Sequence, residues 1–225
     1  MVSELNKVSL IIATYNEEDS LGFVLNEISN YDFFEIIIVD NNSQDKTIDI
    51  ANKFNTKVIT QEKSGWGSAV VQAFNIAEGE YITYMDGDGS YNPKALLEMR
   101  NLMNSNDAVF CSRYKDGAKS PDDTPVRALG NKIFTLIVKV LFGPKISDSL
   151  FFYPMFKKNI LNHINLDSDD FTLCLEMPVK VHQKDLKYVE ILSEERERYA
   201  GVTKVNALVD GFKILIGILA LRSKL

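Results

Sequence analysis

The sequence contains few of the residues from which several common kinds of site are built. Its 225 residues include only two cysteines and two histidines. Cys111 and Cys174 lack the close spacing of a metal site and are too few for a disulfide framework, so we expect a reducing, cytoplasmic compartment. Basic residues number 25 against 31 acidic ones, and the net charge of −6 argues against a general nucleic-acid-binding protein.

Other absences concern nucleotide motifs and membrane spans. No G-x-x-x-x-G-K-[ST] is present, which excludes a P-loop nucleotide hydrolase. No G-x-G-x-x-G follows the first apolar run, which disfavours a dinucleotide oxidoreductase. No stretch reaches the roughly 20 uninterrupted apolar residues of a membrane span. The N-terminal apolar run is short and acidic residues follow it at once, so no cleavable signal is predicted.

What the chain does contain is a regular alternation of strand-like and helix-like segments. Apolar or β-branched runs of strand length occur at 8–14, 35–39, 57–59, 81–85 and 108–112, with a late one at 187–192. A segment typical of a helix follows each of the first four. This alternation predicts an α/β protein with a Rossmann-like, mainly parallel sheet flanked by helices.

The most informative stretch is EGEYITYMDGDGSYNP, residues 78–93. Its strand ends in Asp86 and Asp88, whose side chains share a face because they are two residues apart in an extended segment. Two hard oxygen ligands aimed at one point suit Mg²⁺ or Mn²⁺. The glycines between them allow a sharp turn and the close approach of a bulky anion. An EF-hand is excluded because Tyr91 replaces its invariant glycine, but the motif alone is also typical of a solvated turn.

Polar residues also follow the other predicted strands. They are found at Thr14 to Glu17, at Asp40 to Asn42 and at Arg113. In parallel sheets ligands bind outside the carboxyl ends of the strands, so we expect these residues to meet at one edge. A buried core does not require acidic clusters at three strand ends. Together they predict a site for a nucleotide diphosphate and its metal ion.

Four motifs, SLIIATYNEEDSL, EIIIVDNNSQDKT, GWGSAVVQAF and GEYITYMDGDGSYNP, follow one another over residues 8–93. In order and spacing they resemble the family 2 glycosyltransferases, which have the GT-A fold. The resemblance implies a nucleotide-sugar donor pocket formed by Ala13, Thr14, Tyr15, Glu17, Asp40, Asn42, Lys63, Asp86, Gly87 and Asp88. It also implies that Asp86 and Asp88 hold the metal, with Ser90 standing where relatives often carry a glutamine near it.

Motifs in the second half of the chain make the resemblance more specific: they resemble polyprenyl-phosphate sugar transferases of the dolichyl-phosphate mannosyltransferase type. The runs SRY at 112–114, ISDS at 146–149 and RYAGVTK at 198–204 resemble segments of those enzymes. The FFY at 151–153 departs from their usual GFR. The resemblance implies a catalytic role for Asp148 and an acceptor-phosphate site made by Arg113, Arg127, Arg198, Thr203 and Lys204.

The predicted activity is metal-dependent, inverting transfer of a hexose from a donor of the GDP-mannose or UDP-glucose type to a polyprenyl (dolichyl) phosphate. Such a phosphate has a second pKa of about 6, so its oxygen is already ionised and attacks without a strong base. The hydroxyl of a polysaccharide or glycan would instead need a carboxylate base, for which Asp148 is the candidate. A third alternative is a non-catalytic nucleotide-sugar-binding subunit, against which the intact Asp86 and Asp88 pair argues.

Two segments, 126–142 and 205–221, are apolar over much of their surface and carry spaced basic residues. They suit helices that lie in a membrane interface, although buried core helices or a partner-subunit surface would show the same pattern. We therefore expect a peripheral protein at the cytoplasmic face of a membrane, or one with a small membrane-protein partner. The predicted domain covers 1–204, with a nucleotide-sugar half to about 113 and an acceptor half to 204, before an amphipathic helix over 205–225.

Overall fold

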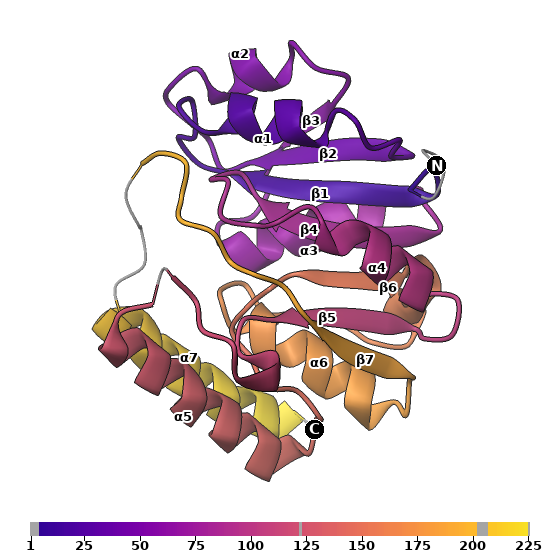
Figure 1. Cartoon of the computed structure of the whole chain (residues 1–225). Helices are drawn as coiled ribbons and strands as arrows, with labels where there is room; N and C mark the ends of the chain where they lie inside the picture. Colours follow the sequence, from indigo (N-terminus) through magenta and orange to yellow (C-terminus); the bar gives the residue numbers. More distant parts are fainter. Residues whose placement is uncertain (1–4, 122, 202–206, 225) are drawn as a thin grey trace.

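A computed structural model of the protein describes residues 5–121, 123–201 and 207–224. These residues form a seven-stranded sheet in the order β3-β2-β1-β4-β6-β5-β7 (Figure 1). The strands are β1 (Val8–Thr14), β2 (Glu35–Asp40), β3 (Lys57–Thr60), β4 (Tyr81–Asp86), β5 (Ala108–Ser112), β6 (Pro154–Lys157) and β7 (Tyr188–Leu192). All neighbouring pairs are parallel except the two that involve β6.

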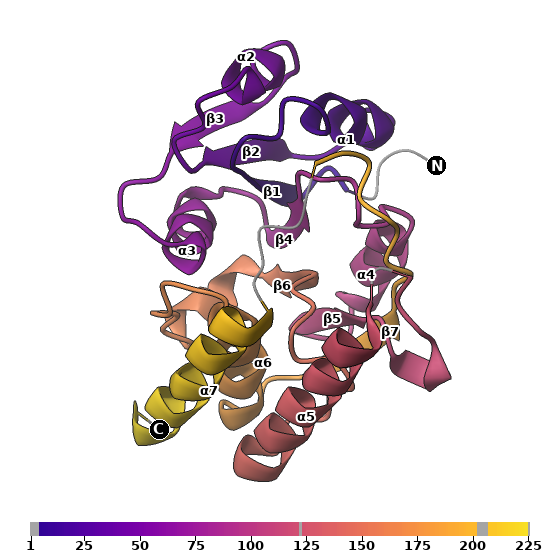
Figure 2. The same ribbon diagram turned by 90° about the vertical axis from the view of Figure 1, so that its left-hand side faces the viewer.

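Helices cover both faces of this sheet. They are α1 (Leu21–Ile28), α2 (Thr47–Ala51), α3 (Trp66–Ile76), α4 (Ala95–Leu102), α5 (Pro125–Phe142), α6 (Leu173–Gln183) and α7 (Ala207–Lys224), with short 3₁₀ turns η1 (Lys115–Gly117) and η2 (Lys158–Asn162). Figure 2 shows α1 and α4 on one side of the sheet and α3 and α6 on the other. The predicted α/β fold with a mainly parallel sheet is confirmed.

The central strands are buried on both faces, which is why they read as continuous apolar runs. In β1, Leu10, Ile11 and Ile12 are all fully buried. A strand covered by helices on both sides has no solvent face and therefore shows no polar alternation. The same holds for Ile37 and Ile38 in β2.

Strand β6 is the element that the sequence analysis did not anticipate. It runs antiparallel between β4 and β5, and Met155 lies opposite both Thr83 and Val109. Pro154 occupies its first position, where a residue without an N–H is tolerated, and the Thr83 hydroxyl donates to its carbonyl oxygen at 2.8 Å. β6 therefore separates the end of β4, at the predicted metal site, from the end of β5, just before Arg113.

Helices α5 and α7 lie side by side at one end of the molecule (Figures 1 and 2). They pack with α6 around a small second core of Val138, Phe142, Leu175, Val179, Ile214, Ile218 and Leu221. Helix α5 begins after Thr124, whose hydroxyl accepts the N–H of Arg127. None of the described helices combines the length and the hydropathy that crossing a membrane requires. The predicted division of the chain at about residue 113 stays a prediction.

Candidate active site

The carboxyl ends of β1, β2 and β4 meet at one edge of the sheet. β1 lies between the other two, and Ala13 is in register with both Val39 and Asp86. One residue further along, Thr14 pairs with Asp40. The structure thus brings together the polar residues that the sequence analysis placed at three separate strand ends.

Asp40 is fully buried, and polar groups of the same edge surround it. Its Oδ1 accepts the hydroxyl protons of Thr14 at 3.0 Å and Ser43 at 2.6 Å, and its Oδ2 accepts the N–H of Ser43 at 2.8 Å. The Ser43 hydroxyl in turn accepts the N–H of Asn16 at 2.8 Å. Asp40 therefore fixes the loop after β1 to the loop after β2, and Ser43 is a partner that the sequence analysis missed.

Other residues predicted for the donor pocket lie on the same two loops. Tyr15 is exposed, the N–H of Glu17 donates to the hydroxyl of Thr47 at 2.8 Å, and Asn42 adopts a left-handed backbone conformation with φ of 56°. Gly87 follows β4 and packs close to Thr14, so that a Cβ there would lie 3.1 Å from the Thr14 methyl group. The loop after β4 thus approaches the loop after β1 closely.

The loop after β4 presents Asp88 in a tightly bonded turn. Asp88 is buried, and its Oδ1 accepts the N–H of Ser90 at 2.9 Å and the Ser90 hydroxyl at 2.7 Å. Its Oδ2 lies 2.7 Å from Nη1 of Arg198. The predicted metal-site serine thus supports Asp88, while Arg198, predicted for the acceptor phosphate, lies against the same carboxylate.

Asp86 lies close to Asp88 and makes fewer polar contacts. Its carboxylate accepts a hydrogen bond from the hydroxyl of Tyr84. Burial, and then the negative charge of Asp88, raise the pKa of Asp86 to about 7. A divalent cation between the two carboxylates would remove this repulsion and favour the ionised form.

The carboxylates fit the coordination of Mg²⁺ or Mn²⁺ with a diphosphate. Among the described residues, no group of three or more histidine, cysteine, aspartate or glutamate side chains could hold a metal ion by itself. Mg²⁺ is typically bound by one or two carboxylates, with substrate phosphates and water completing the shell. Asp86 and Asp88 match that donor set, and the diphosphate of a bound nucleotide would complete it.

Residues 193–201, here called the strap, follow β7 as the orange segment of Figure 1 and lie against the loop that carries Asp88. Its backbone N–H groups at Arg196 and Tyr199 donate to the carbonyl oxygens of Ser90 and Asp88 at 2.8 and 2.9 Å. The Tyr199 ring stacks on Phe23 with centroids 4.1 Å apart. The strap is thus fixed on both sides of Arg198, whereas Thr203 and Lys204 lie outside the described residues.

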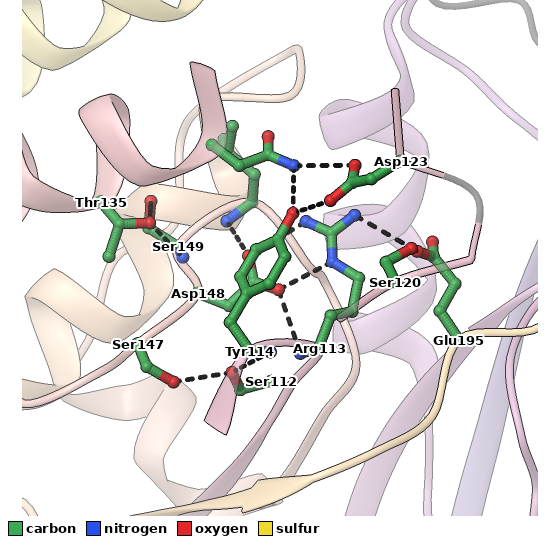
Figure 3. A network of polar contacts seen from close by, with 12 residues as sticks. Ser112, Arg113, Tyr114, Ser120, Asp123, Thr135, Ser147, Asp148, Ser149 and Glu195 are labelled. Carbon is green, nitrogen blue, oxygen red and sulfur yellow. Dashed lines mark hydrogen bonds and ion pairs between the residues drawn. The ribbon is translucent and has the colours of Figure 1, made fainter. Parts of the chain in front are cut away.

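Arg113 and Asp148 form a buried, two-point ion pair (Figure 3). Nε and Nη2 of Arg113 donate to Oδ2 and Oδ1 of Asp148 at 2.7 and 3.0 Å, and Glu195 lies 3.5 Å from Nη1. Burial acts against the charge on Arg113, but the carboxylates of Asp148 and Glu195 outweigh it and raise its pKa above the usual value. The predicted acceptor-binding arginine and the predicted catalytic carboxylate therefore neutralise each other.

A pocket of about 300 Å³ joins the two halves of the site. Its charged end is lined by Asp86, Ser90, Arg113 and Arg198. Its other end lies between α5 and α7 and is lined by Val126, Arg127, Phe134, Leu150 and Ile214. The predicted residue Arg127 thus lines the same pocket as Asp86 and Arg198.

The Gly-Trp-Gly run at the start of α3, residues 65–67, packs against the loop 167–170. Lys63 pairs with Oδ1 of Asp169 at 2.7 Å, and its predicted contact with the nucleotide stays a prediction. The N–H of Gly67 donates to the Asp169 carbonyl oxygen at 2.9 Å. A Cβ at Gly65 or Gly67 would lie 2.2 or 2.3 Å from a backbone oxygen of the loop. The two glycines are required for this close approach.

We expect Gly67→Ala to destabilise the protein by about 1–3 kcal/mol, because the added methyl group forces the loop 167–170 away. Urea denaturation measures the change in the free energy of unfolding. Gly130→Ala is the matched control, since Gly130 is also helical and its Cβ would meet nothing within 4 Å. An equal effect of both substitutions would contradict the close packing described here.

Comparisons with known proteins agree with this geometry. The family model for glycosyl transferase family 2 matches residues 9–165. The chain is 31% identical over 199 residues to the dolichol-phosphate mannosyltransferase of Pyrococcus furiosus, covering 82% of this chain but only 55% of that protein. It is 28% identical to the dolichyl-phosphate hexose transferase of Haloferax volcanii, covering 92% of this chain and 90% of that protein.

Among solved structures, glucosyl-3-phosphoglycerate synthase from Mycobacterium tuberculosis, in complex with Mn²⁺, UDP and glucosyl-3-phosphoglycerate, is similar with a TM-score of 0.74. That match has 15% sequence identity and covers 96% of this chain and 80% of that one. The sheet and its flanking helices therefore form a GT-A fold, the fold of an enzyme that transfers sugars. The chain belongs to glycosyl transferase family 2.

Proposed function

We propose that this glycosyltransferase is a metal-dependent, inverting hexosyltransferase that transfers sugar from a nucleotide donor to a polyprenyl phosphate. The observation that carries the proposal is the pocket whose charged end contains Asp86 and Arg198 and whose apolar end lies between α5 and α7. A lipid phosphate likewise has a charged head group and an apolar chain. The names of the Pyrococcus and Haloferax relatives support the same acceptor class.

The donor occupies the edge formed by the loops after β1, β2 and β4. Asp86 and Asp88 hold Mg²⁺ or Mn²⁺, which supplies positive charge to the leaving diphosphate. Ser90 orients Asp88 through its two hydrogen bonds. With its charge balanced by the metal, the diphosphate can leave without a proton from an acid of the protein.

The acceptor phosphate lies where the charged and apolar ends of the pocket meet. Arg127 and Arg198 both line the pocket, and arginine binds phosphate through two parallel hydrogen bonds. The acceptor oxygen is already ionised at neutral pH, so binding and orientation are the main tasks of the protein. The alternative of a hydroxyl acceptor is disfavoured because both oxygens of its candidate base, Asp148, are bonded to Arg113.

The outer faces of α5 and α7 are the proposed contact with the membrane at its cytoplasmic side. Large apolar residues are exposed there at Val126, Leu129, Ile133, Leu136, Val140, Phe212, Leu215, Ile216 and Leu219. Lys132, Lys139 and Arg222 are exposed among them, and residues 125–142 include no acidic side chain although the chain carries a net charge of −6. Apolar and basic residues together suit a surface of anionic lipid.

Leu136→Glu is expected to weaken binding to anionic phospholipid vesicles at least tenfold, because it replaces an exposed apolar side chain, proposed to insert into the lipid, by a charge that the lipid repels. Vesicle co-sedimentation measures the change. Leu97→Glu on α4 is the matched control, since Leu97 is also an exposed helical leucine. Equal vesicle binding by both variants and the unsubstituted protein would contradict this contact.

A transfer assay tests the proposed function. The protein is incubated with Mn²⁺ or Mg²⁺, a panel of GDP- and UDP-sugars, and a short polyprenyl phosphate. We expect sugar to appear on the lipid with one donor and to disappear on chelation of the metal. Donor hydrolysis without a lipid product would favour a hydroxyl acceptor, and absence of both turnover and metal-linked nucleotide binding would favour a non-catalytic subunit.

A further inference from the structure

Two hydrogen bonds connect the side chains of Trp66, Tyr84 and Asp86, the last of which is a predicted metal ligand. Tyr84 lies in β4 two residues before Asp86, so both side chains face the same side of the strand. Tyr84 is fully buried. Its hydroxyl contacts Nε1 of Trp66 at 3.0 Å on one side and Oδ1 of Asp86 on the other.

The chemistry of the three groups fixes the direction of both hydrogen bonds. An indole N–H donates and cannot accept, so Trp66 gives its proton to the lone pair of the Tyr84 oxygen. The single proton of Tyr84 is then directed to Asp86. One carboxylate oxygen of Asp86 is thereby engaged, and no other residue that the structure describes is bonded to the second oxygen.

We infer that Tyr84 is a positioning residue that, together with Trp66, orients Asp86 so that one oxygen remains available to a divalent cation. This inference rests on the proposed metal-dependent transfer. A ligand held by such an outer partner is restricted to one orientation, and loss of the partner typically costs about 10–100-fold in metal affinity. We call Trp66, Tyr84 and Asp86 the relay.

Three aromatic rings hold the first member of the relay in place. The Trp66 ring meets the edges of Tyr84 and Phe152 at centroid distances of 5.6 and 5.2 Å, and stacks on Phe171 at 5.2 Å. Ring packing, and not the Asp86 carboxylate, therefore directs the Trp66 N–H toward the Tyr84 hydroxyl. Trp66 and Asp86 also both line the pocket, so the residue that orients Tyr84 forms part of the wall against which a substrate would lie.

Tyr153 offers a direct comparison with a tyrosine that has no such role. It is also fully buried in the same core, and its hydroxyl donates to the backbone carbonyl of Asn92 at 3.2 Å. Removing the Tyr153 hydroxyl deletes its hydrogen bond to Asn92, and removing the Tyr84 hydroxyl deletes its two bonds to Trp66 and Asp86; neither change alters the ring. Tyr84 and Tyr153 differ in the partner, which for Tyr84 is the carboxylate of the metal site.

The test is the dissociation constant of Mn²⁺, measured by electron paramagnetic resonance in the presence of UDP or GDP. We expect Tyr84→Phe to raise the dissociation constant about tenfold or more, and Tyr153→Phe to leave it within about twofold, while circular dichroism shows both variants folded. In transfer assays the Tyr84→Phe rate should return when Mn²⁺ is raised to saturation.

Trp66→Phe is a second variant that removes the indole donor and lets the Tyr84 hydroxyl rotate. It should weaken Mn²⁺ binding in the same direction, and it keeps the test valid if Tyr84→Phe does not fold. Wild-type Mn²⁺ affinity in a folded Tyr84→Phe or Trp66→Phe protein would overturn the relay and leave the proposed function standing. Failure of the unsubstituted protein to bind Mn²⁺ with either nucleotide would overturn both.

Discussion

Asp88→Asn is expected to lower the rate of sugar transfer about a thousandfold while the protein remains folded. Asparagine keeps an oxygen that can accept the two hydrogen bonds of Ser90, so the turn survives. What disappears is the negative charge opposite the metal and the diphosphate. Steady-state transfer with saturating donor and acceptor measures the loss, and circular dichroism confirms the fold.

Asp49→Asn is the matched control for this substitution. Asp49 is an exposed aspartate on α2 that does not line the pocket, and the same chemical change there should leave the rate unchanged. Undiminished transfer by the Asp88→Asn variant would remove the metal role from this carboxylate. Equal losses in both variants would point to a general effect of charge.

The second large effect is expected from Asp148→Ala, which should lower the free energy of unfolding by about 3–5 kcal/mol. The substitution leaves the Arg113 guanidinium buried without its two-point partner, because Glu195 is 3.5 Å away and contacts one nitrogen. Removing one member of a buried pair costs far more than the pair contributes in net terms. Urea denaturation at pH 7 gives the free energy directly.

An exposed pair provides the comparison. Lys7 and Glu80 lie 2.8 Å apart with side chains 56% and 51% exposed, so Glu80→Ala should cost less than about 1 kcal/mol. A similarly small cost for Asp148→Ala would contradict the buried pair. That result would also mean that Arg113 does not hold Asp148, so that Asp148 could act as the base that its ion pair now disfavours.

The sequence was sufficient to predict the features that depend on apolar runs within strands and on polar residues at strand ends. Parallel strands buried on both faces produce continuous apolar runs, and the ends of neighbouring parallel strands share an edge. Asp40 and Asp86 could therefore be placed at one edge before the structure was known. The same reasoning could not find β6, because Pro154 opens it and it is only four residues long.

Contacts between distant segments were outside the reach of that reasoning. The pairing of Arg113 with Asp148 joins residues 35 positions apart, and the contact of Arg196 with Glu27 joins residues 169 positions apart. Arg198 was expected to bind the acceptor phosphate, but only the path of the strap reveals that it lies against Asp88. Tyr84 was not singled out from the sequence, because its contact with Trp66, 18 positions away, is visible only in the fold.

The central claim is that the acceptor is a lipid phosphate. The most direct measurement compares the initial rate of transfer to a polyprenyl phosphate with that to the polyprenol of equal chain length, with saturating nucleotide sugar and Mn²⁺. We predict rapid transfer to the phosphate and none above background to the alcohol, because the site supplies cations for an ionised oxygen while Asp148 is held by Arg113. Equal or faster transfer to the alcohol would contradict the account.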